Sequence, residues 1–269
     1  VNVVLPPIAL DGPTVTIRKF PEDPMTMERL IGYGSLTPEA AEVLERMVQA
    51  KYNIFISGGT GSGKTTFLNA LSNYIPKDER VITIEDSAEL QIKGVANLVR
   101  LETRNANMEG KGEVTIRDLI RSSLRMRPER IIVGEVRGAE ALDMLQAMNT
   151  GHDGSLSTGH SNSTNDMLSR LETMVISGNN IPIEAIRQQI ASALDIIIQL
   201  SRLRDKSRRT LEITEVVGYE DGKIRLNPIY RFVEHGEDPD GRVIGGLERT
   251  ENPLIHKEKF HMAGLSDQV

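Results

Sequence analysis

The chain has 269 residues, a formal net charge of −6 and no cysteine. This length allows a substantial core, in one large or two modest domains, and the lack of cysteine excludes disulfides and thiolate metal sites. The negative charge argues against nucleic acid as the main partner. No apolar run approaches the ~18 residues of a membrane-spanning helix, and early prolines argue against a signal peptide. We therefore expect a cytoplasmic protein.

The first 24 residues are predicted to hold two strands, at 1–5 and 14–18, separated by a turn rich in proline. Because the chain starts in a predicted strand without a methionine, we expect residues 1–24 to be the end of a smaller α+β N-terminal domain that lies mostly upstream. Prolines then mark a linker, which we place at 25–36. The main α/β domain is expected at 37–233, and it begins with a helix that has Pro38 in its first turn.

A glycine-rich segment, GGTGSGKTT, follows the apolar run 52–56 and precedes a helix-like stretch. It completes the pattern G-x-x-x-x-G-K-[ST] in the strand, loop and helix order of a phosphate-binding loop. Glycines let backbone N–H groups curl around a triphosphate, and the helix directs its positive end toward the anion. Lys64 is predicted to bridge the β- and γ-phosphates and Thr65 to hold Mg²⁺. The predicted ATP-binding residues are Gly58, Gly59, Thr60, Gly61, Ser62, Gly63, Lys64, Thr65 and Thr66.

Strand and helix patterns alternate after this loop, which predicts a parallel sheet with helices packed on it. Acidic residues follow two of the apolar strands, Glu85 and Asp86 after 81–84 and Glu135 after 131–133. Ligands of open α/β sheets bind at these carboxyl ends, so the acids are predicted to activate water and support Mg²⁺. Gly134 stands where an aspartate often precedes the second acid. Metal support is therefore assigned to Glu85 or Asp86.

A second glycine-rich segment, 150–161, contains His152 and His160. These histidines are expected to flank a short strand and face one site. A metal site is not favoured, because no third ligand is close in sequence. We predict that His160 senses the γ-phosphate.

The last third of the α/β domain contains a basic turn at 202–209, interpreted as a solvated hairpin. Two strands, 211–219 and 223–232, surround a turn at 221–222. From 234 to 269 glycine, aspartate, proline and histidine accumulate, which predicts an irregular tail.

Three sequence stretches closely resemble the CpaF/TadA-like ATPases of the type II/type IV secretion ATPase superfamily. They are LETR at 101–104, the run from LRMRPERIIVGEVRG to GHDGS at 124–155, and STGHSNS at 157–163. The resemblance covers 3–232 and implies a RecA-like ATPase domain, a homo-hexameric ring and a place at the cytoplasmic face of the inner membrane. It also implies that inner-membrane platform proteins of a pilus or secretion apparatus are partners, and that contact with the membrane is peripheral and through them.

The resemblance also implies residue roles. Walker A covers 58–65, the Asp box 82–86, the atypical Walker B 131–135 and the His box 151–160. Glu135 becomes the catalytic carboxylate, with Glu85 supporting metal and water. Members of this family bring arginines to the γ-phosphate. Four arginines of this chain lie at matching motif positions, although the sequence does not assign their contacts: Arg18, Arg104, Arg125 and Arg137. For any one of them, a surface salt bridge is a nearly equal explanation.

The sequence therefore predicts a hexameric Mg²⁺-ATP hydrolysing motor of Tad/Flp-type pilus assembly or protein secretion. A type IV secretion or pilus retraction ATPase is an alternative within the superfamily. Two other classes remain open, namely a nucleic-acid motor of RecA-like fold and a scaffold that binds ATP without hydrolysing it.

Overall fold

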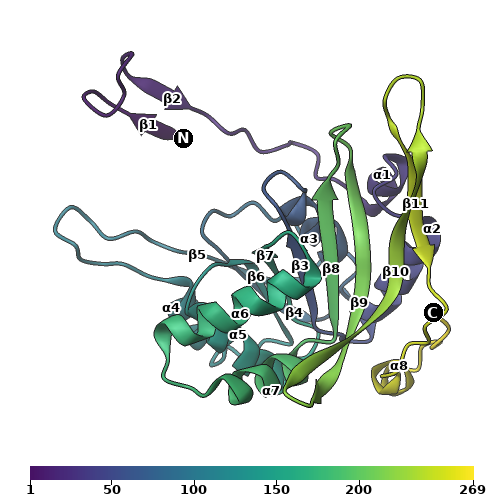
Figure 1. The fold of residues 1–269 in the computed structure, drawn as a ribbon. Coiled ribbons are helices and arrows are strands. Elements are labelled where there is room, and N and C mark those ends of the chain that lie inside the picture. The colour runs from purple at the N-terminus through teal and green to yellow at the C-terminus, as the bar shows by residue number, and fades with distance from the viewer.

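The computed structural model describes residues 1–269, whose main element is a nine-stranded mixed sheet (Figure 1). The strand order is β11-β10-β9-β8-β3-β7-β6-β4-β5, and the strands from β8 to β5 are parallel. The parallel strands are β3 (Ile54–Gly58), β4 (Arg80–Glu85), β5 (Asn97–Glu102), β6 (Arg130–Val136), β7 (Leu156–His160) and β8 (Ile196–Arg202). The antiparallel extension is β9 (Arg208–Glu220), β10 (Lys223–Glu237) and β11 (Val243–Arg249). The predicted α/β class with a mostly parallel sheet is confirmed.

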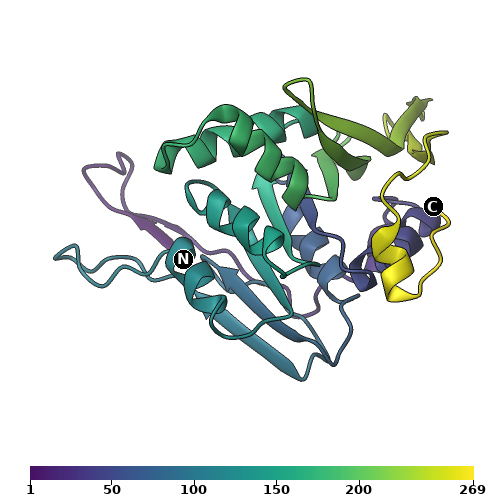
Figure 2. The same ribbon diagram turned by 90° about the horizontal axis from the view of Figure 1, so that it is seen from below.

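Helices cover both faces of the sheet (Figures 1 and 2). One layer is α1 (Met27–Gly32), α2 (Pro38–Gln49) and α3 (Lys64–Ser72), and the other is α4 (Ile116–Ser123), α5 (Glu140–Asn149), α6 (Thr164–Gly178) and α7 (Ile183–Ala193). Successive side chains of a strand point to opposite faces, so in β3 the side chains of Ile54 and Ile56 join the first core and Phe55 the second. Because both faces are covered, strands such as β3 are buried throughout. No helix is long and apolar enough to cross a membrane.

The N-terminal segment stands away from the large sheet, where it forms a hairpin of β1 (Asn2–Val4) and β2 (Thr14–Thr16) (Figure 1). The boundary near residue 24 and the assignment of residues 1–24 to a further domain stay predictions. The predicted linker is partly a packed element. Thr26 caps α1, which buries Met27 and Leu30 in the first core.

The C-terminal residues form regular structure, so the expectation of an irregular tail from 234 is wrong. Strand β10 continues to Glu237, β11 pairs with it, and α8 (Glu258–Ala263) packs against the body. Of the residues that suggested an irregular tail, Asp238, Pro239, Asp240 and Gly241 form the turn between β10 and β11. Three apolar residues of the segment are buried in the first core, namely Leu247, Leu254 and Phe260.

Candidate functional site

The predicted phosphate-binding loop connects β3 to α3 and has the backbone that its glycines favour. Gly61 and Gly63 adopt φ values of 74° and 93°, which side chains with a Cβ rarely tolerate. A Cβ on Gly58 would lie 2.3 Å from Ser62 Oγ. Lys64 Nζ donates a hydrogen bond to the Gly59 carbonyl at 3.1 Å. The lysine therefore folds back over a loop that is already curled.

A cavity of about 730 Å³ lies against this loop, a size typical of small-molecule sites. Almost all of its lining is polar or glycine. Of the sequence-predicted residues it contains Thr60, Gly61, Gly63, Lys64, Thr65, Thr66, Glu135, Arg137, His160 and Arg18. The structure thus brings together most of the predicted site, and Gly58, Gly59 and Ser62 shape the loop beneath it.

Glu135 lies near the carboxyl end of β6, at a bulge in the pairing of β6 with β7 between Val133 and Val136. Bulges redirect side chains and are common beside active sites. Thr158 Oγ1 fixes the bulge by donating to the Gly134 carbonyl at 2.7 Å. The Glu135 carboxylate therefore faces the cavity rather than the interior of the sheet.

Arg137 holds that carboxylate. Its Nη2 and Nε donate to Glu135 Oε2 at 2.6 and 2.9 Å, and its Nη1 lies 3.5 Å from Asp86 Oδ2. The hydrogen bond to Glu135 raises the pKa of Arg137 above its ordinary value. In the same cavity, burial lowers the pKa of Lys64, and the nearby charge of Glu135 partly opposes this effect. Two cations thus lie near the Glu135 carboxylate. The pKa of Arg137 is raised and the pKa of Lys64 is lowered.

Glu85 does not reach the cavity, which corrects its prediction as a catalytic and metal-supporting residue. Its side chain is only 3% exposed, and burial raises its pKa. Its Oε1 accepts the backbone N–H groups of Glu89 and Leu90, each at 3.0 Å. Those bonds turn the carboxyl group into the protein. The acid that lines the cavity is Glu89, four residues further along.

The absence of an aspartate at 134 has a steric explanation. A Cβ on Gly134 would lie 3.0 Å from Cγ of Glu85, closer than almost all real contacts of this kind. The side chain of Glu85 on β4 therefore occupies the space that a residue at 134 on the neighbouring strand β6 would need. Positions 85 and 134 together therefore have room for one acidic side chain, and Glu85 supplies it.

His160 ends β7 directly beside the loop, because Gly58 and His160 are partners in the parallel pairing of β3 and β7. It lines the cavity, as predicted. The expectation that His152 faces the same site is wrong. His152 precedes β7, where its Nδ1 lies 3.3 Å from the Ala147 carbonyl, and a five-residue strand puts its two ends at opposite edges of the sheet.

The four predicted arginines separate into groups. Arg18 and Arg137 line the cavity, and Arg18 Nη1 lies 4.0 Å from Glu89 Oε1. Arg104 donates to the Gly112 carbonyl at 2.6 Å and lines an adjacent cavity of about 320 Å³ together with Arg137. Arg125 is exposed beyond α4, on the chain that enters β6 at the end remote from Glu135. Within this chain the structure does not bring Arg125 to the phosphate loop.

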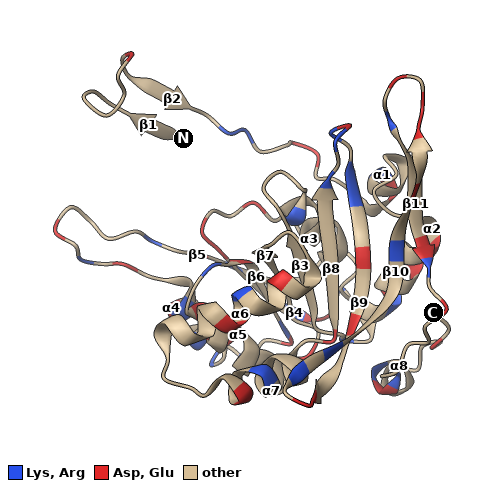
Figure 3. Ribbon diagram, viewed as in Figure 1, with Lys and Arg blue, Asp and Glu red and all other residues tan.

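Sequence reasoning missed four charged residues of the cavity, Lys19, Glu89, Arg170 and Arg208. The basic turn between β8 and β9, visible in Figure 3, was interpreted as solvated. Arg204 fits that interpretation, since it pairs with Glu234 and Glu237 on β10. Arg208 does not, because its Nε donates to the Gly61 carbonyl at 2.8 Å. Arg208 begins β9 and is the register partner of Arg202, which ends β8. Because β8 runs parallel to β3, the hairpin after β8 lies at the edge of the sheet where ligands bind.

A less polar cavity of about 420 Å³ adjoins the other side of the loop. Its apolar lining comes from the segment around α1, from α3 and from β8. The apolar and aromatic residues are Met25, Leu30, Tyr33, Phe67 and Leu200, and Ser62, Gly63, Thr66 and Arg208 form the border toward the loop.

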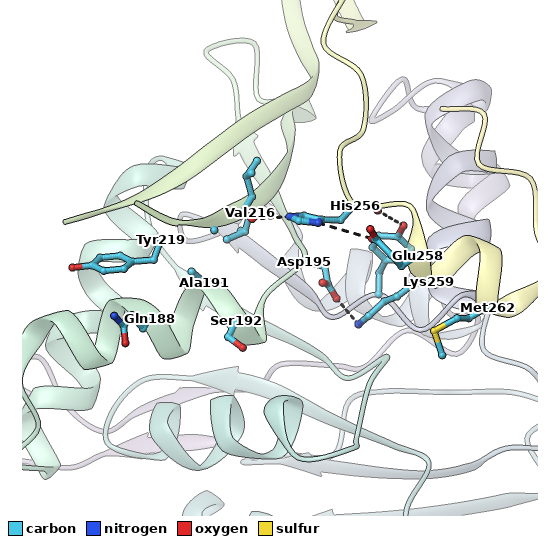
Figure 4. A pocket seen from close by; sticks show the side chains of 13 residues that line it. Gln188, Ala191, Ser192, Asp195, Val216, Tyr219, His256, Glu258, Lys259 and Met262 are labelled. Atoms are coloured by element: carbon cyan, nitrogen blue, oxygen red, sulfur yellow. Dashed lines mark hydrogen bonds and ion pairs between the residues drawn. The ribbon is translucent and has the colours of Figure 1, made fainter. Parts of the chain in front are cut away.

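A third cavity, of about 720 Å³, contains no residue of the phosphate loop (Figure 4). It lies between α7, β9 and α8. Lys259 on α8 bonds to Asp195 Oδ2 at 2.7 Å, and the pKa of Asp195 is raised by burial while Lys259 opposes the rise. His256 Nε2 lies 2.6 Å from the Val217 carbonyl. These contacts attach the C-terminal segment to the body.

Comparison with known proteins gives one family and several relatives. The family model described as "Type II/IV secretion system protein" matches residues 2–233. A Mycobacterium tuberculosis (strain CDC 1551 / Oshkosh) protein named for conjugal transfer is 37% identical over 249 residues, which are 93% of this chain and 70% of the relative.

Solved structures are also similar. The VirB11 ATPase of the Brucella suis type IV secretion system, determined with sulphate, has a TM-score of 0.60 and 32% identity. The similarity covers 77% of this chain and 61% of that one. The pilus retraction motor PilT with bound ADP has a TM-score of 0.56 and 27% identity, over 72% of this chain and 53% of that one. The chain thus spans between half and two thirds of these two solved proteins.

Proposed function

Because the chain belongs to the family described as type II/IV secretion system protein, we propose that it hydrolyses Mg²⁺-ATP and uses the energy to move protein subunits through a membrane-bound apparatus. The observation that carries the proposal is the cavity in which Lys64, Glu135 and Arg137 meet above a preformed phosphate loop. The loop would bind the phosphates through backbone N–H groups and Lys64.

The residues present also suit Mg²⁺, which prefers oxygen ligands and takes part of its shell from phosphates. Thr65, Glu89 and Glu135 supply a hydroxyl and two carboxylates to the cavity. The ion would neutralise charge on the β- and γ-phosphates. Glu135 would orient the attacking water and accept its proton, and the products would be ADP and inorganic phosphate.

Arg137 gives this site two arrangements. Its guanidinium donates both hydrogen bonds to one oxygen of Glu135, Oε2, and so occupies that oxygen. A γ-phosphate offers Arg137 an alternative anion at the same cavity. Transfer of the arginine from carboxylate to phosphate would free Glu135 and stabilise charge in the transition state.

The less polar cavity beside the loop is where we place the nucleobase. Its aromatic and apolar lining, at the border of Ser62 and Thr66, suits a planar base whose phosphates reach the loop. The sequence resemblance to CpaF/TadA-like ATPases supports a homo-hexamer in Tad/Flp-type pilus assembly, located in the cytoplasm at the inner membrane through platform proteins. Type IV secretion or pilus retraction is the alternative, supported by the VirB11 and PilT similarities.

The test is phosphate release from Mg²⁺-ATP by wild type and Glu135→Gln, at protein concentrations that span assembly. The matched control is Glu251→Gln, the same change at an exposed residue outside the cavity. We expect turnover that rises with protein concentration, disappears in Glu135→Gln and persists in the control. ATP binding without turnover in the wild type would favour the scaffold alternative, and turnover stimulated by single-stranded nucleic acid would favour a nucleic-acid motor.

A further inference from the structure

The segment 86–91 carries Glu89 and forms neither helix nor strand. Buried backbone donors need partners, and here the partners are side chains rather than other backbone groups. The acceptors are Glu102 for Ala88 N–H at 2.8 Å, Glu85 for Glu89 and Leu90 N–H at 3.0 Å each, and Asn69 for Gln91 N–H at 2.7 Å. The path of the segment is therefore set by three side-chain acceptors that extend from the body of the domain.

Glu85 has the central place among them. It alone accepts two successive N–H groups, both with the same oxygen, Oε1. Its other oxygen, Oε2, is buried and has no hydrogen-bond partner. The side chain is locked from the other direction as well, since its Cβ and Cγ pack over Gly134, which leaves the space for it. One rigid carboxyl group thus holds the backbone on which Glu89 is carried.

Glu89, unlike Glu85, lines the phosphate cavity. Its side chain is 30% exposed, lines the phosphate cavity with Lys64 and Thr65, and has Arg18 at 4.0 Å. If the loop were flexible, this carboxylate could move by about 1 Å or more. Catalytic groups lose about a hundredfold in rate when displaced by 1 Å, so the anchoring of the loop matters for any role of Glu89 in the cavity.

We propose that Glu85 is a positioning residue that aims Glu89 into the phosphate cavity by accepting the N–H groups of Glu89 and Leu90. This inference rests on the proposed ATPase function, in which Glu89 supplies one of the cavity carboxylates. It replaces the sequence-based assignment of Glu85 as a group that contacts metal or water. The acid is required for its shape and its acceptor oxygen, and its charge is dispensable.

Replacing Glu85 by glutamine distinguishes a positioning role from a role as metal ligand or general base. In Glu85→Gln the carbonyl oxygen can take the place of Oε1 and keep both hydrogen bonds, while a metal ligand or general base would be lost. In Glu85→Ala both N–H groups lose their acceptor. In Glu89→Gln the loop is kept but the cavity carboxylate is removed. Glu251→Ala serves as the matched control at an exposed position.

We expect Glu85→Gln to keep turnover within about threefold of wild type, because the same two bonds persist. Glu85→Ala should lose about a hundredfold in kcat through displacement of the loop, with ATP affinity nearly unchanged. Glu89→Gln should also lose turnover, and Glu85→Ala combined with it should be no slower than Glu89→Gln alone. Loss of turnover in Glu85→Gln equal to that in Glu89→Gln would overturn the proposal, as would additive losses in the double variant.

A second measurement does not depend on activity. Hydrogen exchange at the amides of Glu89 and Leu90 should be faster in Glu85→Ala than in wild type, and unchanged in Glu85→Gln and in Glu251→Ala. Unchanged exchange in Glu85→Ala would overturn the positioning role. If the wild type hydrolyses no ATP, the proposed function fails, and the exchange experiment still decides whether Glu85 holds the loop.

Discussion

Arg137 and Glu135, two residues apart on the same stretch of chain, face each other across the cavity wall with two hydrogen bonds of 2.6 and 2.9 Å. The pair is about one quarter exposed at Glu135 and two thirds exposed at Arg137. Such an exposed pair adds little to stability. Its significance lies in the position of the carboxylate that it holds in the cavity.

Replacing Arg137 should therefore affect catalysis more than folding. We expect Arg137→Ala to lower kcat about a hundredfold, the usual cost of one charge-stabilising donor, while the melting temperature changes little. Turnover and thermal unfolding of the same preparation measure both. Arg204→Ala is the control, since it breaks a pair with Glu234 and Glu237 away from the cavity. Equal losses in the two variants would contradict a specific role.

The nucleobase assignment is tested at Tyr33, which lines the apolar cavity beside the loop. Loss of stacking on an aromatic ring costs about 1–3 kcal/mol per base, or roughly fivefold or more in affinity. We expect Tyr33→Ala to weaken ATP binding by this amount and to leave binding of inorganic triphosphate unchanged. A titration with each ligand gives the answer. Equal weakening of both would place the tyrosine near the phosphates instead.

Adding one methyl group at Gly134 should disturb the packing against Glu85. The new Cβ would lie 3.0 Å from Glu85 Cγ, and overpacking of this kind costs about 1–3 kcal/mol. We expect Gly134→Ala to lower the free energy of unfolding in urea by about 1 kcal/mol and to reduce turnover. Gly246→Ala, where nothing lies within 4 Å of the added Cβ, should change neither quantity through crowding.

Asp205 makes the stability of the C-terminal strands depend on pH. Its carboxylate accepts from Ser207 and from the Val243 backbone N–H at 2.9 Å, and these bonds lower its pKa from 3.8 to about 2. A lowered folded pKa contributes stability above pH 3.8 that is lost as the pH falls toward 2. Asp205→Asn should lower the melting temperature at pH 7, and the difference should vanish near pH 2. A difference that is constant with pH would contradict this linkage.

The C-terminal helix is tested by truncating Phe260, which is fully buried with its ring centroid 4.9 Å from that of Tyr52. Replacement of a buried phenylalanine by alanine costs about 3–5 kcal/mol. We expect Phe260→Ala to lose stability in this range in a urea titration. Met262→Ala in the same helix is the control, because that side chain is 87% exposed. Similar stability of the two variants would show that α8 is not part of the cooperative unit.

The sequence predicted the site where local rules sufficed. The glycine pattern located the loop, and the carboxyl-end rule indicated Glu135. The glycine-rich segment with two histidines indicated His160, which the β3–β7 register puts beside Gly58. Both predictions depend only on strand direction and on which residue ends a strand. The mostly parallel sheet followed from the alternation of strand and helix patterns.

The positions of the other site residues could not be predicted, because they depend on tertiary contacts that sequence spacing does not encode. Nothing in the sequence indicates that Glu85 turns back to its own loop and leaves the cavity to Glu89, because the direction of the carboxyl group is set by two backbone N–H groups and by a glycine on another strand. The C-terminal tail was misjudged for a related reason. Its composition is polar, and its order comes from a few side chains buried against distant helices.

Strand β9 joins two parts of the molecule that otherwise share no contact described above. At one end Arg208 bonds to the phosphate loop, and seven residues further Glu215 accepts the backbone N–H groups of Ile255 and His256. An extended strand spans about 23 Å over seven residues. A single strand therefore connects the sheet edge that carries the phosphate loop to the segment that leads into α8.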